Sequence, residues 1–186
     1  MRICEYLWLV FLVVWMLSAM RTKPVQTREG VSSRLSYTVL TVLGAYMMFS
    51  RQAPQPWLNT IILPDALWIQ ALGIVITALG IAFAIWARVH LGGNWSGSVT
   101  VKVGHQLVRT GPYRFVRHPI YSGMILASLG TALAQTHISG LVAVVLFYVG
   151  FKVKSKIEEQ TMISTFGAEY SDYSRTTGAI LPKLHF

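Results

Sequence analysis

The chain has 186 residues, of which 53% are hydrophobic and 12% are charged, whereas a soluble domain carries about 25% charged residues. This composition excludes an ordinary soluble domain and indicates an integral membrane protein. The net charge of +9 would suggest a nucleic-acid partner in a soluble protein, but here it follows membrane topology, so we expect no such partner. One cysteine and five scattered histidines exclude an internal disulfide and indicate no metal site.

Three segments in the first half are long and apolar enough to cross a membrane, which takes about 20 residues of helix. They cover residues 3–20, 35–50 and 66–87, and loops that contain Arg, Lys or Pro separate them. The first segment is predicted to be a retained helix rather than a signal peptide. Glu5 interrupts its apolar run, and the cations just after residue 20 resemble a stop-transfer flank.

The next apolar stretch is longer than one ordinary span. Residues 119–151 contain no Asp, Glu, Lys or Arg, and residues 135–140 supply polar and glycine turn signals at the midpoint. We therefore predict two short helices in a tight hairpin, which brings the total to about five transmembrane helices. Residues 152–169 are then predicted to form a helix that leaves the membrane, the exit helix, with Gly167 as its stop.

The distribution of Lys and Arg orients this arrangement. With the N-terminus outside, fourteen of the sixteen cations fall in inner segments and only Arg2 and Arg51 fall outside. Cations concentrate on the cytoplasmic side of membrane proteins. A single helix over residues 119–151 would put the last five cations outside, so the hairpin is favoured. We expect one all-α membrane domain over residues 1–186, with its N-terminus outside and its C-terminus in the cytoplasm.

Polar residues gather in two of the inner segments. The connector, residues 91–118, ends in the run Gly-Pro-Tyr-Arg-Phe-Val-Arg-His-Pro-Ile-Tyr-Ser-Gly over residues 111–123. This run meets a predicted helix N-terminus, whose free N–H groups suit an anion. The exit helix carries the second group, residues 154–159. Because the hairpin returns the chain to the inner side, both groups can close over one pocket, and clustered polar residues at a membrane end indicate a functional site.

These residues also have plainer interpretations. Taken alone, His118 is a helix cap or an interfacial residue, Arg114 and Arg117 are topology anchors, and Tyr113 and Tyr121 belong to an aromatic belt. The interpretation as a functional site depends on their being placed together.

The adjacent Glu158 and Glu159 project about 100° apart on a helix, so we expect that they cannot both face the same way. A carboxylate that faces the pocket would bind an amino group or balance a sulfonium charge. Alternatively, the two glutamates form a solvated face with ordinary i,i+4 contacts to Lys154.

A longer pattern links these segments. Five groups of residues follow one another along the chain: His105-x-Leu107, Gly111-x-Tyr113, Arg117-His-Pro-x-Tyr121-x-Gly123, Glu158-Glu159 and Phe166-Gly-x-Glu-Tyr170-x-x-Tyr173. In order and spacing they resemble the isoprenylcysteine carboxyl methyltransferase family, over about residues 94–182. A dozen spaced matches are more specific than any short motif. The resemblance implies an S-adenosylmethionine-dependent methyltransferase whose region from residue 91 to 186 follows three N-terminal membrane helices over residues 1–90.

The resemblance also implies a set of site residues. The first glutamate of the acidic pair contacts the cofactor in that family, and further cofactor contacts lie in the connector and at the start of the hairpin. Carried over to this chain, the implied cofactor-binding residues are Thr100, His105, Gln106, Leu107, Val108, Tyr113, Arg117, His118, Pro119, Ile120, Tyr121 and Glu158.

Two residues are predicted to act on the acceptor. Lys154 stands where the eukaryotic enzymes carry an arginine that handles the substrate carboxylate, and lysine cannot make the planar bidentate pair. This departure puts the prenylcysteine substrate in doubt but leaves methyl transfer plausible. A carboxylate acceptor is already ionised at neutral pH and needs no general base. An amine acceptor would need one, and Glu159 and His118 are the candidates.

The preferred interpretation is methyl transfer to a lipophilic or lipid-anchored acceptor that reaches the pocket from the bilayer. The acceptor group is expected to be a carboxylate, as in isoprenylcysteine, with no metal involved. One alternative is a phospholipid or other lipid N-methyltransferase of the same architecture. The others are an NADPH-dependent membrane reductase of the sterol-reductase kind and a non-catalytic membrane subunit.

Overall fold

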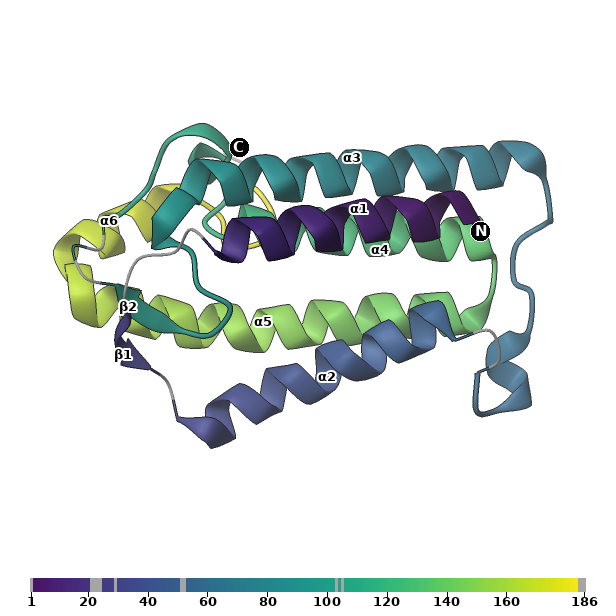
Figure 1. Ribbon diagram of the computed structural model, residues 1–186, viewed down its shortest axis with the longest axis horizontal. Helices are drawn as coiled ribbons and strands as arrows, with labels where there is room; N and C mark the ends of the chain where they lie inside the picture. The colour runs from purple at the N-terminus through teal and green to yellow at the C-terminus, as the bar shows by residue number, and fades with distance from the viewer. Residues whose placement is uncertain are drawn as a thin grey trace.

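The computed structural model describes residues 2–20, 25–28, 30–50, 53–102, 104 and 106–183. Five long helices run roughly along one axis, and a short sixth helix lies at one end of the bundle, away from the N-terminus (Figure 1). The helices are α1 (Arg2–Ala19), α2 (Val31–Phe49), α3 (Leu67–Leu91), α4 (Pro119–Gln135), α5 (Ile138–Phe166) and α6 (Ala168–Thr176). The end that carries α6 is called the inner end below.

The predicted hairpin is confirmed. Helices α4 and α5 pack against one another and are joined by two residues, of which Thr136 adopts a left-handed conformation with φ of 61°. The exit helix is the continuation of α5, which runs unbroken from the turn to Phe166. Gly167 ends it as expected, at φ of 53°, a conformation that glycine adopts without the steric cost of a Cβ.

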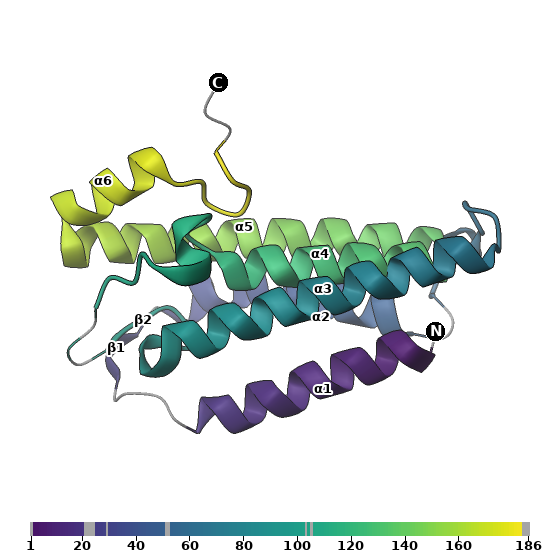
Figure 2. The ribbon, with the colours of Figure 1, turned by 90° about the horizontal axis from the view of Figure 1, so that it is seen from above.

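Among the described residues, three helices are long and apolar enough to cross a membrane, namely α1, the helical stretch Leu67–Asn94 that contains α3, and Ile138–Phe166, which is α5. Many of their large apolar side chains are exposed, including Leu9, Val13 and Met16 on α1 and Val75 and Leu79 on α3. Hydrocarbon rather than water is the solvent that such surfaces require. Figure 2 shows α3 and α4 side by side, with α1 along the face of α3.

Helices α3 and α4 meet along a seam of small residues. Gly73 and Gly80 on α3 face Gly130 and Gly123 on α4, and a Cβ on Gly73 or Gly80 would lie 2.6 Å from the facing glycine's carbonyl oxygen. Small residues let helix backbones approach closely in membranes, where packing replaces the hydrophobic effect as the driving force for association. The seam therefore fixes the start of α4, and with it the polar run that precedes it.

Helix α1 docks on this pair through a polar contact. The Trp8 indole N–H donates to the Thr131 hydroxyl at 3.0 Å, and that hydroxyl lies 3.2 Å from the hydroxyl of Thr77. Trp8 also packs with Phe11 against α3 and α4, in a cluster that includes Ala84 and Ala127. Helix α2, by contrast, packs mainly against α5. One side of the bundle is therefore formed by α1 on α3, and the other by α2 on α5.

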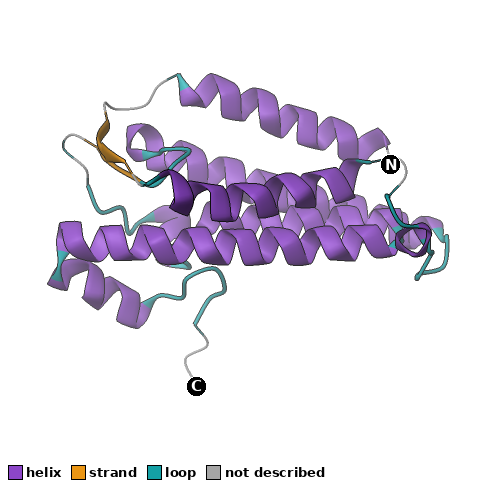
Figure 3. Ribbon diagram, turned by 90° about the horizontal axis from the view of Figure 1, so that it is seen from below, coloured by secondary structure: helices purple, strands orange, loops and turns teal. Residues whose placement is uncertain are grey.

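A small sheet at the inner end was not predicted from the sequence. Strand β1 (Val25–Arg28) pairs antiparallel with β2 (Thr100–Lys102), so the α1–α2 connection is hydrogen-bonded to the connector that follows α3. Figure 3 shows both strands at the same end of the bundle as α6. This pair is the only sheet in the part of the chain that the structure describes, and the regular structure there is otherwise helical. Strands of four and three residues leave no hydrophobic periodicity to detect in the sequence.

We predict that Gly80→Ala disrupts the α3–α4 seam. The added methyl group meets backbone atoms of α4, which cannot move without separating the helices. Overpacking of this kind costs about 1–3 kcal/mol, so thermal unfolding in detergent should shift to lower temperature. The control is Gly30→Ala, because a Cβ at Gly30 meets no atom within 4 Å. Equal melting temperatures for the two variants would contradict the seam.

Candidate functional site

The candidate site is a cavity of about 440 Å³ at the inner end of the bundle. Its apolar part is lined by Phe11, Leu12 and Trp15 of α1, Thr38 and Thr41 of α2, and Met124, Phe147 and Phe151 of the hairpin. Its polar part is lined by Arg117, His118, Tyr121, Lys154, Glu158, Tyr170 and Tyr173, and residues 94–100 of the connector cover it. The cavity therefore joins a charged inner end to the hydrophobic interior of the bundle.

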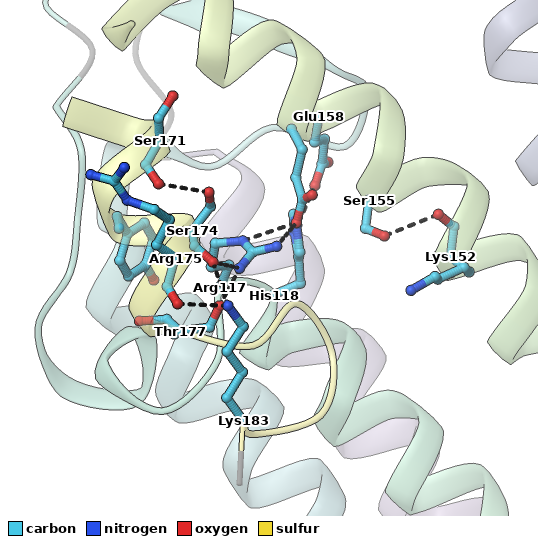
Figure 4. A network of polar contacts seen from close by, with 12 residues as sticks. Arg117, His118, Lys152, Ser155, Glu158, Ser171, Ser174, Arg175, Thr177 and Lys183 are labelled. Carbon is cyan, nitrogen blue, oxygen red and sulfur yellow. Dashed lines mark hydrogen bonds and ion pairs between the residues drawn. The ribbon is translucent and has the colours of Figure 1, made fainter. Parts of the chain in front are cut away.

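His118 lies between the two adjacent glutamates. Its Nδ1 is 3.3 Å from Glu158 Oε2 and its Nε2 is 3.1 Å from Glu159 Oε1. As expected for neighbours about 100° apart on a helix, only Glu158 of the pair lines the cavity. Both side chains are nevertheless long enough for their carboxylates to reach opposite edges of the one imidazole ring between them. Figure 4 shows His118 beside Glu158.

The contacts of His118 define its protonation. An ionised carboxylate only accepts hydrogen bonds, so a ring whose two nitrogens both face carboxylates must carry a proton on each. Burial alone would lower the pKa of His118. Hydrogen bonds and charges from Glu158 and Glu159 outweigh burial, so the pKa lies above the ordinary value of 6.5. The raised pKa therefore favours the imidazolium form of His118, in which both ring nitrogens donate to the carboxylates.

Arg117 ties this cluster to the segment after α6. Its Nε and Nη2 lie 3.0 and 2.7 Å from Glu159 Oε1, and its Nη1 donates to the carbonyl oxygens of Ser174 and Thr177. The backbone N–H groups of Arg117 and His118 also donate to the carbonyls of residues 178 and 179. Figure 4 shows Arg117 between Ser174 and Thr177 on one side and α5 on the other. The polar end is thus closed by chain that follows α6.

Four aromatic rings connect the polar and apolar parts of the cavity. His118 stacks on Tyr121 with ring centroids 5.5 Å apart, Tyr121 on Phe151 at 4.9 Å, and Phe151 on Phe147 at 6.0 Å, all within 11° of parallel. The Tyr121 hydroxyl donates to Glu158 Oε1 at 2.6 Å. The stack joins α4 to α5 and holds the Glu158 carboxylate at the cavity wall.

Lys154 lies one helical turn before Glu158 and also lines the cavity. Its ammonium donates to the Gly97 carbonyl at 2.7 Å and lies 5.2 and 5.5 Å from the ring centroids of Tyr37 and Tyr121. The cation is therefore held by two aromatic faces and the connector. An ammonium has three donors, and this arrangement leaves donors for a ligand.

Two tyrosine hydroxyls around the cavity stay protonated at neutral pH. Burial, opposed by the charges of Arg117 and Arg109, raises the pKa of Tyr173 to about 12. Burial and the nearby Glu158 charge also raise the pKa of Tyr113 above its ordinary value. Tyr173 donates its hydroxyl proton to the Tyr113 carbonyl at 2.6 Å. These groups can donate hydrogen bonds but cannot remove a proton.

The hydroxyl of Thr100 is the clearest open position for a ligand. Thr100 is 6% exposed and lines the cavity, and its Oγ1 has no hydrogen-bond partner within the described part of the chain. A buried hydroxyl without a partner costs about 1–3 kcal/mol. A bound molecule with a donor or an acceptor at that point would remove this cost.

Most of the predicted site residues lie together. The residues that line the cavity are Thr100, Gln106, Leu107, Val108, Tyr113, Arg117, His118, Ile120, Tyr121, Lys154 and Glu158. Pro119 is buried at the first position of α4, and Glu159 contacts Arg117 and His118; neither is part of the lining. His105 lies outside the described residues. The roles assigned to all of these residues remain predictions.

Sequence reasoning missed the wall that α1 and α2 contribute and the two tyrosines of α6. The missed lining residues include Phe11, Leu12, Trp15, Tyr37, Thr38, Thr41, Tyr170 and Tyr173. Uniformly apolar helices give no signal that separates a lipid-facing side from a cavity-facing side. The α6 tyrosines did carry a signal, because both belong to the spaced pattern that ends at Tyr173.

A family model described as phospholipid methyltransferase matches residues 68–169, more than half of the chain. The chain belongs to this family. The matched region contains α3 except for its first residue, the connector, the hairpin and the glutamates, and therefore most of the residues that line the cavity. It stops before Tyr170 and leaves out α1 and α2.

Named relatives add detail. The protein-S-isoprenylcysteine O-methyltransferase of Tribolium castaneum is 30% identical over 118 residues, which cover 62% of this chain and 42% of that protein. The cobalt-zinc-cadmium resistance protein of Cupriavidus metallidurans is 26% identical over 125 residues, covering 64% and 54%. The chain thus spans less than half of the insect enzyme.

A solved structure with a similar fold gives further detail. It is the eukaryotic intramembrane Ras methyltransferase, an isoprenylcysteine carboxyl methyltransferase, with a TM-score of 0.62 and 27% sequence identity. The match covers 79% of this chain and 52% of that one. Together with the three apolar helices, it identifies this family member as a multi-pass membrane protein.

The charged cluster predicts a pH-dependent stability. The folded-state pKa of His118 is raised, so its stabilisation is fully present below about pH 6.5 and is lost as pH rises through the folded-state value. We expect His118→Asn to lower the melting temperature by several degrees at pH 6 and by less at pH 9.

The control is His90→Asn, because His90 Nε2 pairs with the Thr110 hydroxyl rather than with an acidic pair. Melting curves in detergent across this pH range measure both variants against the parent protein. A His118→Asn deficit that is constant from pH 6 to pH 9 would show that the ring is neutral.

Proposed function

We propose that this protein is a membrane methyltransferase that uses S-adenosylmethionine to methylate a carboxylate on a lipophilic acceptor. The observation that carries the proposal is that Glu158 and Lys154, one helical turn apart on α5, both line a cavity that continues into the apolar interior. Family membership and the named relatives support methyl transfer over the reductase interpretation. Because the chain spans only part of those relatives, its own activity and substrate are our inference.

The cavity lining fits the proposed cofactor. S-adenosylmethionine supplies a methyl group on a sulfonium, and it also carries an amino group, a carboxylate and ribose hydroxyls. Glu158 would accept from the amino group, and the unpartnered Thr100 hydroxyl would bond to a polar group of the cofactor. Gln106, Leu107 and Val108 of the connector would line its side. We infer that His118 and Tyr121 hold Glu158 in place rather than touching the reacting atoms.

Lys154 would orient the acceptor. A carboxylate has a reference pKa near 4, so it is an anion at neutral pH. Its oxygen would bond to the methyl carbon as the bond from that carbon to sulfur breaks, and the products would be the methyl ester and S-adenosylhomocysteine. The ammonium would hold that anion while remaining bonded to Gly97. Alignment and electrostatics in a water-poor cavity then provide most of the catalysis. The apolar lining between α1 and α2 would take the hydrocarbon part of an acceptor that arrives from the bilayer.

A carboxylate fits this site better than an amine does. An amine acceptor must lose a proton, and the sequence offered only Glu159 and His118 as bases. His118 has no free nitrogen, because both face carboxylates. Glu159 accepts from Arg117 and His118 and does not line the cavity. We therefore assign Glu159 a positioning role instead of the base that an amine acceptor would require.

The second candidate is a phospholipid N-methyltransferase, which the description of the matching family model favours. Glu158 is the one cavity-lining carboxylate of the pair, and it would have to accept the amine proton. The variants of Lys154 described below separate the two acceptor classes.

We further propose five membrane spans, α1 to α5, with the inner end in the cytoplasm. The support is the distribution of fourteen cations against two. A reporter after residue 183 is then expected in the cytoplasm and a tag before residue 2 outside, as measured by protease or labelling access in cells. Finding both ends on one side of the membrane would overturn this topology.

The cofactor role predicts that Glu158→Gln weakens binding of S-adenosylhomocysteine. Loss of one charge-assisted hydrogen bond implies about 1.5–3 kcal/mol, or about ten- to a hundredfold in Kd. Isothermal titration of the detergent-purified protein measures the change. Glu159→Gln is the matched control, since it removes the other half of the His118 pair without changing the cavity lining. Equal losses of affinity in both variants would assign the effect to the cluster instead of to a ligand contact.

The acceptor role predicts opposite responses for the two acceptor classes. Lys154→Ala should lower kcat/KM for a prenylcysteine-type carboxylate by about ten- to a hundredfold and change cofactor affinity little. Lys154→Arg should retain or raise that activity, because it restores planar bidentate pairing. With an amine lipid, removal of the nearby cation should be neutral or helpful.

Methyl transfer from labelled cofactor, compared across the variants with one carboxylate lipid and one amine lipid, decides between these outcomes. Lys156→Ala serves as the control, because Lys156 is an exposed cation on the same helix. Full carboxylate activity in Lys154→Ala would refute the role of Lys154.

A further inference from the structure

Arg88 is a buried cation that the proposed chemistry does not use. It lies in the last turn of α3 and is 2% exposed. Transfer of a charge into a protein interior costs several kcal/mol unless the surroundings compensate. Ionisable residues inside a membrane bundle generally serve a function.

The compensation comes from two helix ends. Arg88 Nη2 donates to the carbonyl of Ser18 in the last turn of α1 at 2.6 Å, and Nη1 donates to the carbonyl of Gly92, the C-cap of α3, at 3.0 Å. Each helix C-terminus carries about half a negative charge, so the two together balance one guanidinium. Arg88 therefore joins the inner ends of α1 and α3 by charge as well as by hydrogen bonds.

Arg88 also holds two tryptophans that line the cavity. Its guanidinium carbon lies 4.2 Å from the ring centroid of Trp95 and 6.0 Å from that of Trp15. Trp95 meets Trp15 edge to face at 5.0 Å, and Trp15 contacts Phe11 at 5.0 Å. These three rings, with Leu12, form the side of the cavity that we call the α1 wall.

The α1 wall faces a helix from the other side of the bundle. Helix α1 packs on α3, whereas α2, which supplies Tyr37, Thr38 and Thr41 to the cavity, packs mainly on α5. The Trp8–Thr131 hydrogen bond holds α1 farther from its inner end. At the inner end, beside the cavity, Arg88 fixes α1 and thereby the spacing between the α1 wall and α2.

We propose that Arg88 is a positioning residue that sets the width of the apolar part of the cavity through Trp15 and Trp95, and so determines how the hydrocarbon part of the acceptor fits. The effect on the acceptor rests on the proposed function, whereas the effect on helix spacing does not. The wall should stabilise the bound acceptor equally in the ground state and in the transition state. A change in the wall should therefore alter KM more than kcat.

The first test measures the spacing directly. Spin labels at Leu17 on α1 and Leu35 on α2, both exposed and outside the cavity lining, report the distance between the two inner ends in a Cys4→Ala background. We expect one narrow distance distribution with Arg88 present. Arg88→Met should broaden or shift it, and Arg88→Lys should be intermediate, because an ammonium keeps the charge but lacks the planar fork. The same distribution in all three proteins would overturn the proposal.

The second test separates an effect on acceptor binding from an effect on cofactor binding. Arg88→Met should raise the acceptor KM about tenfold while kcat and the Kd of S-adenosylhomocysteine stay within about twofold. Trp95→Leu should raise KM similarly, and Arg88→Met should add little in that background, because the two residues act in series. Additive losses, or equal losses in KM and cofactor affinity, would refute a role through the wall.

The tests remain decisive if a variant fails to fold or if the proposed function is wrong. If Arg88→Met does not fold, Arg88→Lys and Trp95→Leu carry both tests. If the parent protein binds no S-adenosylhomocysteine and methylates no lipid, the proposed function fails, and the spin-label distances still decide whether Arg88 sets the spacing.

Discussion

The candidate site depends on one imidazole ring that holds two carboxylates side by side. Glu158 and Glu159 would repel one another at the inner end of the bundle, where screening by water is weak. His118 separates them, and Arg117 supplies a second positive charge. Two anions and two cations make the cluster neutral. Neutrality leaves Glu158 free to face the cavity as an anion, and it ties α5 to the start of α4 and to the chain after α6.

The sequence predicted the elements whose signals are local. A long uncharged stretch with a turn at its midpoint is enough to predict the hairpin, and Gly167 is enough to predict the end of α5. Leu107, Val108 and Ile120 of the cavity lining were named only through the family resemblance. Polar members of the lining, such as His118 and Glu158, also stood out because an apolar environment does not tolerate polar groups without a reason. In that setting a polar residue is itself the signal.

The rest could not be predicted because it depends on tertiary contacts. Whether Glu158 and Glu159 converge depends on a ring from another helix, which helical periodicity cannot represent. The pairing of β1 with β2 joins segments about seventy residues apart, and both strands are too short to show alternation. The α1 wall is indistinguishable in sequence from lipid-facing surface, because leucine and phenylalanine suit both environments.

The contacts of Arg117 with the chain after α6 have a consequence for synthesis in the cell. The carbonyls that Arg117 binds belong to residues 174 and 177, and those that its backbone and the backbone of His118 bind belong to residues 178 and 179. On the ribosome, the charged cluster cannot reach its final arrangement until this segment has emerged and all the preceding helices are inserted. Assembly of the cluster, and with it the ligand binding that we propose, is thereby coupled to synthesis of the chain through residue 179, and a nascent chain stalled in the hairpin would hold an incomplete cavity.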